Sequence, residues 1–380
     1  MIREKRGLVQ RILAAMARVL VAALCTFPSA YAFQVLPKIS DVDRKLTSLS
    51  ANGDWLGQWF VGGVLPMLKS PVHEAITLAA LECEAGAGNE PACVTADAVR
   101  KYRTLLYGVR WPDDPPFLLS ASTPPRNIKC DVRVTLRSTA QPQCWKGLFD
   151  DAGKRAAVFS NQAPGKPPFG PGDYLLYRSH YGDLQFMHSM GAYDGEPGRV
   201  TRERMKMWAR FLWGVAVKEL PTDRYLRELG VSDLGTYFPG DMTATNLLAT
   251  GIVEVRKELE QVALGALLHM VQDSYSQAHA ERAPEPGGVC PGTEVGRPGK
   301  VLRYYSYARQ RGELHDSEDT FDALRLHSIQ SSPSVVDTSR SLIELAKRKG
   351  SWVDAEKLFD CLFELASPDE PAQAGRFAAP

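Results

Sequence analysis

The chain has 380 residues, of which 44% are hydrophobic and 23% are charged. This balance supports a large folded core and excludes a chain that is disordered throughout. The 45 Lys and Arg residues nearly cancel the 44 Asp and Glu residues. The composition therefore gives no sign of a strongly basic surface of the kind that binds nucleic acid.

The first 32 residues have the features of a cleaved signal peptide. A basic start leads into an apolar run that ends at Cys25, and the small residues of SAYA precede a predicted mature start at Phe33. An uncleaved anchor is the alternative, but the apolar run is short for a membrane span and contains Arg18. Without this segment the chain keeps 40 basic and 43 acidic residues. We expect a secreted or periplasmic protein of slightly negative charge.

Six cysteines follow the signal peptide, and an even number in an exported chain favours disulfides over free thiols. Zinc ligation by cysteine is disfavoured because no C-x-x-C spacing occurs. The connectivity is open, but short separations favour two local pairs and leave a third pair to tie the C-terminal region back: Cys83–Cys93, Cys130–Cys144 and Cys290–Cys361.

Apolar residues recur at helical spacing over most of the chain, and strand-like alternation is scarce. In chain order, helices are predicted at 71–84, 95–107, 201–219, 222–229, about 241–281, around residue 315, 335–349 and 353–365. The stretch 110–198 is rich in Pro and Gly and is expected to be largely irregular.

These elements predict an all-α fold with one domain and a long irregular insertion in mid-chain. The domain is expected to span 71–367, between an N-terminal segment at 33–70 and a flexible tail at 368–380. The most strongly patterned helix starts at Asp241 or Thr243, which are good N-cap residues. It runs to about Glu281, and Gly251 or Gly265 is expected to break or kink it.

His269 and Asp273 lie four residues apart on this helix, so their side chains occupy the same face and can reach one cation. His279 is ten residues from His269, which on a continuous helix is a rise of about 15 Å. That distance is too long for both rings to bind one ion. This spacing predicts two metal positions, with Asp273 able to bridge them.

A second pair, His315 and Asp319, repeats the four-residue spacing and can complete the position that starts at His279. Two histidines and one carboxylate suit a catalytic zinc that keeps a coordination site open for water. Gln272, Ser274 and Ser276 lie between the predicted ligands, on a helix that is expected to be buried. A buried polar stripe needs compensation, and bound metal ions would supply it.

The spacing His-x3-Asp-x5-His, followed by His-x3-Asp, resembles the zinc-dependent phospholipase C and S1/P1 nuclease superfamily. The segments LHMVQDSYSQAHAER, RYYSYARQ and LHDSEDT are more similar to bacterial phospholipase C members than to fungal nucleases. The resemblance covers roughly residues 73 to 319. It implies an all-helical domain with zinc ions in one cleft.

The resemblance also implies ligands upstream of the long helix. The histidine that opens the first helix would be His73, and an aspartate in the following loop would be Asp113, with Asp114 as the alternative. A further ligand would be His188, because it has the apolar flank usual for the family, and His180 competes with it. The family's zinc-binding N-terminal tryptophan has no clear counterpart, since the predicted mature start is Phe33. Trp59 has a family-like separation from His73 but would require a second cleavage, so two to three zinc ions are expected.

These residues predict an exported zinc-dependent phosphodiesterase, with a phospholipid or membrane surface as substrate and no obligate protein partner. Asp113 is the expected catalytic base for an attacking water. The alternatives are a single-strand nuclease acting on nucleic acid, and a catalytically degenerate, metal-stabilised binding domain. Chelation, with assays on phospholipid and on single-stranded DNA, separates the three.

Overall fold

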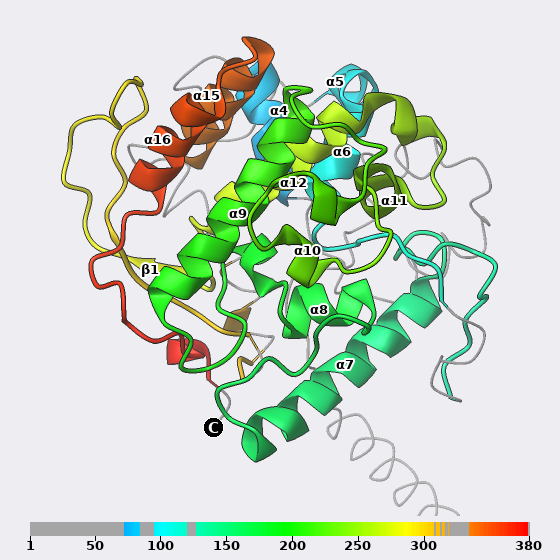
Figure 1. Cartoon of the computed structure of the whole chain (residues 1–380). Coiled ribbons are helices and arrows are strands. Elements are labelled where there is room, and N and C mark those ends of the chain that lie inside the picture. The colour runs from blue at the N-terminus through cyan, green and yellow to red at the C-terminus, as the bar shows by residue number, and fades with distance from the viewer. Residues whose placement is uncertain are drawn as a thin grey trace, which may run out of the picture.

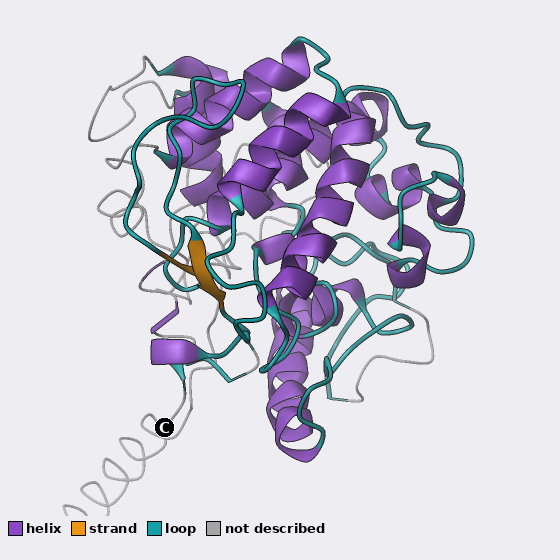
Figure 2. Ribbon diagram, turned by 60° about the vertical axis from the view of Figure 1, so that its left-hand side comes forward, coloured by secondary structure: helices purple, strands orange, loops and turns teal. Residues whose placement is uncertain are grey.

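The computed structural model is mostly helical and contains one small antiparallel sheet among its described residues (Figures 1 and 2). This confirms that the fold is mostly helical, and the small sheet departs from the predicted all-α class. The predicted signal peptide, Phe33, Trp59, Cys93 and Asp319 lie outside the described residues. The structure describes residues 72–83, 95–119, 127–307, 309–311, 314–315, 318 and 334–378.

The helical and strand elements follow one another in chain order. The α-helices are α4 (Val72–Glu82), α5 (Ala96–Lys101), α6 (Arg103–Arg110), α7 (Pro142–Gln162), α8 (Leu175–Tyr181), α9 (Gly198–Ala216), α10 (Leu234–Tyr237), α11 (Ala244–Ala249), α12 (Leu259–Asp273), α15 (Val335–Lys347) and α16 (Trp352–Leu362). Four 3-10 turns and two strands join them: η1 (Gln185–His188), η2 (Leu226–Glu228), η3 (Glu254–Glu258), η5 (Gly375–Phe377), β1 (Ala280–Arg282) and β2 (Val301–Tyr304).

Helix α12 is the centre of the fold, and α4, α6, α9 and α15 pack around it (Figure 1). Two glycines let the backbones of α6 and α12 approach closely. A Cβ added at Gly265 would lie 2.3 Å from the carbonyl oxygen of Leu105, and one at Gly108 would lie 2.3 Å from the carbonyl oxygen of Val262. Gly265 therefore does not kink α12, as the sequence had suggested, but allows a close helix crossing. Because α6 ends at Arg110, this crossing places the following turn so that Asp113 lies beside His269 of α12.

The predicted long helix from 241 to 281 is wrong in its extent. The chain breaks near Gly251, which has a positive φ of 73°, and α12 ends at Asp273. Beyond this point the chain turns, and the guanidinium of Arg282 donates to the carbonyl oxygen of Ser274 at 3.0 Å. A long-range partner thus takes a carbonyl that a longer helix would use internally.

The prediction that 110–198 is largely irregular is also wrong in part, because α7 within it has 21 residues. Pro142 stands at its first turn, where a missing N–H costs nothing, and this proline contributed to the misassignment. Two glycines inside the helix are explained by packing, since a Cβ would lie 2.7 Å from Ile128 at Gly147 and 2.9 Å from the Tyr181 hydroxyl at Gly153.

The other helices agree with the sequence more closely. The predicted helix at 95–107 is divided at Tyr102 into α5 and α6, and the one at 222–229 is reduced to the short turn η2. The remaining predictions at 71–84, 201–219, 335–349 and 353–365 correspond to α4, α9, α15 and α16.

Two of the predicted disulfides are formed, Cys130–Cys144 and Cys290–Cys361. Cys83 is also disulfide-bonded, and its predicted partner lies outside the described part of the chain. Disulfides of this kind indicate an extracellular or otherwise oxidising compartment. Among the described helices, none combines the length and apolar character that crossing a membrane would require.

Residues 368–378 do not form the flexible tail that the sequence predicted. Gln373 pairs with Tyr305, and Pro371 pairs with Pro197, each through an isolated backbone bridge. The side chain of Phe377 is buried. This segment therefore packs on the domain beside the chain that follows β2.

Candidate metal centre

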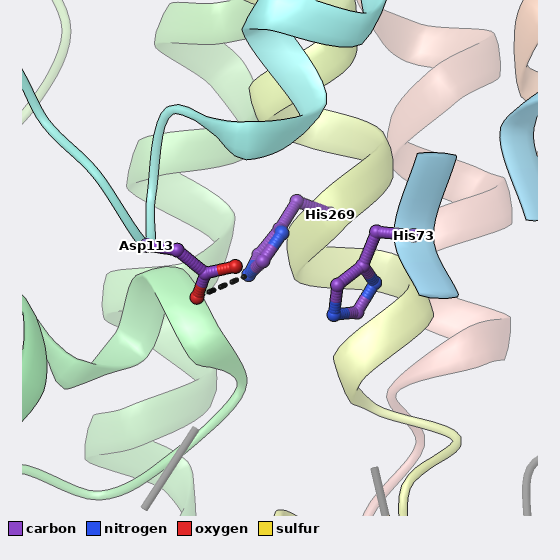
Figure 3. Close-up of side chains that lie close together, drawn as sticks. All are labelled: His73, Asp113 and His269. Carbon is purple, nitrogen blue, oxygen red and sulfur yellow. Dashed lines mark ion pairs between the residues drawn. The ribbon is translucent and has the colours of Figure 1, made fainter. Parts of the chain in front are cut away.

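Side chains from four separate elements meet at the C-terminal end of α12. His73 comes from the first turn of α4, Asp113 from the turn after α6, and His188 from the end of η1, while His269 and Asp273 lie on α12. Figure 3 shows three of these side chains, with Asp113 and His73 approaching His269 from opposite sides. The structure thus brings together five residues that the sequence predicted as ligands.

The centre of this group is a triangle of one carboxylate oxygen and two imidazole nitrogens. Asp273 Oδ2 lies 2.9 Å from His188 Nδ1 and 3.0 Å from His269 Nε2. The two nitrogens are 3.0 Å apart. Around a tetrahedral zinc ion with bonds of about 2.0–2.1 Å, neighbouring ligand atoms are separated by about 3.3 Å. The triangle is therefore close to the size of one face of a zinc coordination shell.

Asp113 lies beside this triangle. Its Oδ1 is 3.6 Å from His269 Nε2 and 3.8 Å from His188 Nδ1. The adjacent Asp114 has a different role, because its carboxylate accepts hydrogen bonds from the backbone and hydroxyl groups of Ser138 at 2.8–2.9 Å. Of these two aspartates, the structure places only Asp113 among the clustered histidines.

His180, the alternative to His188, is also buried in this region. Its ring centroid is 5.5 Å from that of His188, and its Nδ1 lies 3.0 Å from the carbonyl oxygen of Leu176. Asp113, His180 and His188 can form a further group of three ligand atoms. His188, however, contacts Asp273 directly. Of the two histidines, His188 therefore lies nearer the middle of the cluster.

Asp273 faces two neighbouring positions through its two oxygens. While Oδ2 belongs to the triangle, Oδ1 lies 3.1 Å from His73 Nε2. The ring of His73 is 4.1 Å from the ring of His269, centroid to centroid. This arrangement suits a carboxylate that bridges two ions, but toward His73, whereas helix geometry predicted a bridge between the positions of His269 and His279.

The premise behind the predicted separation of His269 and His279 is wrong, because α12 ends before His279. The turn after the helix brings His279 back, so that its Nδ1 lies 3.7 Å from Asp273 Oδ2. His279 also packs against His315, with ring centroids 4.8 Å apart. A second position at His279 and His315 therefore lies beside the first one, and the predicted third ligand, Asp319, lies outside the described residues.

Burial and the charges within the cluster set its protonation. The pKa of His269 is lowered to about 3, chiefly by burial, with Asp273 opposing the shift and His73 and His188 adding to it. Burial likewise lowers the pKa of His188, against the effect of Asp273. Burial by itself would raise the pKa of Asp273, but the imidazoles of His269, His279 and His73 hold it well below its usual value. At neutral pH His188 and His269 are therefore neutral and Asp273 is ionised, and these are the forms that bind metal ions.

Hydrogen bonds on the outer sides of the rings support the same interpretation. Histidine ligands usually donate their second ring N–H to a neighbouring acceptor, which turns the other nitrogen's lone pair toward the metal. His188 Nε2 lies 3.3 Å from the carbonyl oxygen of Pro112, and His279 Nδ1 lies 2.6 Å from that of His188. A carbonyl oxygen can only accept, so each of these nitrogens donates. The donor set of the described cluster thus fits a bound metal ion.

Two members of the cluster are partly exposed. His188, His269 and Asp273 are almost completely buried, whereas His73 and Asp113 retain 17% and 16% exposure. Water or substrate would reach the cluster past one of these two partly exposed residues. Sequence reasoning did not identify Ser189, which adopts a left-handed φ of 54° and whose hydroxyl donates to the carbonyl oxygen of Met270. This turn holds η1 against α12, and no sequence pattern signals it.

Comparisons of the chain with protein-family models, with curated proteins and with solved structures find no match. The buried His/Asp groups can hold a metal ion on the geometry above.

Proposed function

We propose that this protein is a zinc-dependent hydrolase of phosphodiesters, of the phospholipase C type. The observation that carries the proposal is the buried triangle of His188 Nδ1, His269 Nε2 and Asp273 Oδ2, with Asp113 beside it. Nitrogen and carboxylate ligands in this ratio, with a partly exposed carboxylate beside them, are typical of catalytic zinc. The helical fold, the disulfides and the sequence resemblance agree with this proposal.

The described residues divide into a central position and two flanking ones. His188, His269, Asp273 and Asp113 would hold the central ion. Asp273 with His73 would hold one flanking ion, and His279 with His315 would contribute to the other. When bound, zinc ions lower the pKa of coordinated water and neutralise phosphoryl oxygens.

Asp113 is the proposed general base. It is the carboxylate of the cluster that remains partly exposed, whereas Asp273 is enclosed by imidazoles. A partly exposed carboxylate can be reached by water, and one of its oxygens can accept a proton from an attacking water. The buried histidines keep bulk water away from the inner part of the cluster.

The proposed substrate is a phospholipid, cleaved to diacylglycerol and a phosphorylated head group. The phospholipase-like segments around His269 and His315 support this choice. The slight excess of acidic residues after the predicted signal peptide favours it over a nuclease, which usually needs a cationic surface for the strand. Cleavage of nucleic acid is the main competing outcome of the test.

The test combines metal analysis with two assays. We expect two to three zinc ions per chain by mass spectrometry, hydrolysis of phosphatidylcholine in mixed micelles, and loss of that hydrolysis after chelation. Zinc-dependent cleavage of single-stranded DNA without lipid hydrolysis would replace the phospholipase by a nuclease. A folded protein that binds no metal would overturn the proposal altogether.

Adjacent aspartates supply a matched pair of variants. Asp113→Asn removes the proposed base and a ligand, and we expect at least a 100-fold loss of kcat, the range typical of general-base removal. Asp114→Asn changes the neighbouring carboxylate that holds Ser138, and we expect it to keep zinc content while lowering stability. Equal loss of activity in both variants would contradict the role given to Asp113.

A further inference from the structure

Gln272 is a fully buried amide that lies on α12 between the ligand positions. Its Oε1 lies 3.0 Å from His73 Nδ1, and its Nε2 donates to Thr77 Oγ1 at 3.0 Å and to Ser339 Oγ at 3.3 Å. Each end of this amide is therefore engaged. It connects α12 to the helix that carries His73 and to α15.

The neighbouring hydroxyl fixes which way the amide points. Ser339 Oγ donates its only hydrogen to the carbonyl oxygen of Val335 at 2.8 Å. It must therefore accept from Gln272, so the NH2 group of the amide faces Ser339 and the carbonyl oxygen faces His73. His73 consequently donates from Nδ1. In neutral His73, the Nε2 lone pair then points at Asp273 Oδ1, 3.1 Å away.

Two acceptors at this distance repel each other unless a cation lies between them. A proton on Nε2 would satisfy the pair by making His73 an imidazolium, and a metal ion would do so with His73 neutral. Gln272 thus makes a cation necessary between His73 and Asp273, because it holds the one proton of neutral His73 on Nδ1, the nitrogen that faces away from Asp273.

A glutamine amide contacts Nδ1 of His315 in the same way. Gln310 Nε2 donates to the carbonyl oxygen of Ala278 at 3.1 Å, and its Oε1 lies 2.5 Å from His315 Nδ1. Since the carbonyl of Ala278 can only accept, the orientation of this amide is also determined. His315 therefore donates from Nδ1, and in the neutral ring the lone pair lies on Nε2. The two glutamines act on histidines of two different flanking positions.

We propose that Gln272 and Gln310 are positioning residues, each of which fixes the tautomer of one histidine and thereby governs one flanking metal position. Gln272 acts through His73, and Gln310 acts through His315. The metal part of this inference rests on the proposed function, whereas the tautomer part holds in the metal-free protein. Loss of such an outer hydrogen bond typically weakens metal affinity 10- to 100-fold.

The test is histidine tautomer analysis by two-bond 1H–15N spectroscopy on 15N-histidine-labelled, metal-free protein at neutral pH. We expect Nδ1 of both His73 and His315 to carry a proton in the wild type, whether or not Nε2 of His73 is also protonated toward Asp273. Gln272→Met should remove the tautomer preference of His73 alone, and Gln310→Met should remove that of His315 alone. Wild-type rings protonated on Nε2 alone, or rings unchanged in the Met variants, would overturn the proposal.

Zinc titration supplies the second readout. Each Met variant should lose 10- to 100-fold in affinity at one position and keep the others, and Gln272→Glu should restore the tautomer because its carboxylate still accepts from His73. Thr338→Val is the control, since it removes a buried hydrogen bond to Tyr275 on the same α15 interface without touching a histidine. It should lower stability and leave zinc binding intact.

The outcomes separate this inference from the proposed function. If the wild type shows the predicted tautomers but binds no zinc, the proposed function fails and the positioning role of the glutamines remains. If zinc binds but the Met variants bind it as tightly as the wild type at every position, the positioning role fails.

Discussion

Gly265→Ala tests whether the close crossing of α6 and α12 builds the metal centre. The new Cβ would lie 2.3 Å from the carbonyl oxygen of Leu105 and 2.4 Å from the backbone nitrogen of Val109. Both are backbone atoms of α6, so no side chain can rotate away to relieve the overlap. The helices must separate by about 1 Å to reach ordinary contact distance, as close-packed interiors require.

The magnitude follows from two opposing effects. Overpacking of a core usually costs about 1–3 kcal/mol and occasionally more, and backbone overlap places this variant at the upper end. Replacing glycine by alanine inside a helix returns about 1 kcal/mol through helix propensity. We expect a net loss of about 2 kcal/mol in the free energy of unfolding. Separation of the helices also moves Asp113 away from His269, so the affinity of the central position for zinc should fall.

Denaturant unfolding of metal-free protein measures the first effect, and zinc titration of folded protein measures the second. Gly198→Ala is the matched control, because the nearest atom to its added Cβ is 3.4 Å away, an ordinary contact. That control should change stability by less than about 0.5 kcal/mol and leave zinc affinity unchanged. A Gly265→Ala protein with wild-type stability and zinc affinity would refute the role of the crossing.

Three further predictions concern the whole domain. The pKa of His269 is about 3 when folded, against about 6.5 when unfolded, so the unfolded chain binds the extra proton as pH falls below 6.5. Metal-free protein should lose about 2–3 kcal/mol from this group between pH 7 and pH 4.5, measured by urea unfolding, and a flat profile would contradict the folded-state pKa. Chelation should lower the thermal midpoint reversibly, because zinc at 100 times its Kd adds about 2.7 kcal/mol; a midpoint insensitive to chelator and added zinc would mean that no ion binds the native state. Replacing Cys290 and Cys361 by serine opens a loop of 71 residues and should cost about 4 kcal/mol on chain-entropy grounds, and a loss below 1 kcal/mol would show that the denatured chain is already restrained there.

The sequence by itself indicated the mostly helical fold, because apolar residues at helical spacing mark the buried faces of α4, α9, α15 and α16. It indicated the pairing of Cys130 with Cys144, because a short separation in an exported chain makes a local disulfide the simplest choice. The spacing of His269 and Asp273 also predicted one shared site, since residues four apart lie on one face of a helix.

Other features needed the tertiary structure. At the end of helix α12, Arg282 donates a hydrogen bond to the carbonyl oxygen of Ser274, the residue after Asp273. No local sequence pattern encodes that contact. Helix α7 was missed because its glycines look like breakers until their packing partners are known. The sequence left Asp114 as an alternative to Asp113, and only the structure separates them, because Asp113 lies beside the histidines and Asp114 binds Ser138.

The sequence determined which chemical groups are present and which of them share a helix face. Only the tertiary structure decided which groups meet, because Asp113, His188 and His73 reach Asp273 through the glycine crossing, the turn at Ser189 and the packing of α4. The hydrogen-bond partners that fix each ring's tautomer come from equally distant segments, as Gln272 and Ser339 show. Contacts between residues far apart in the chain depend on packing of the whole domain, and no local periodicity specifies them.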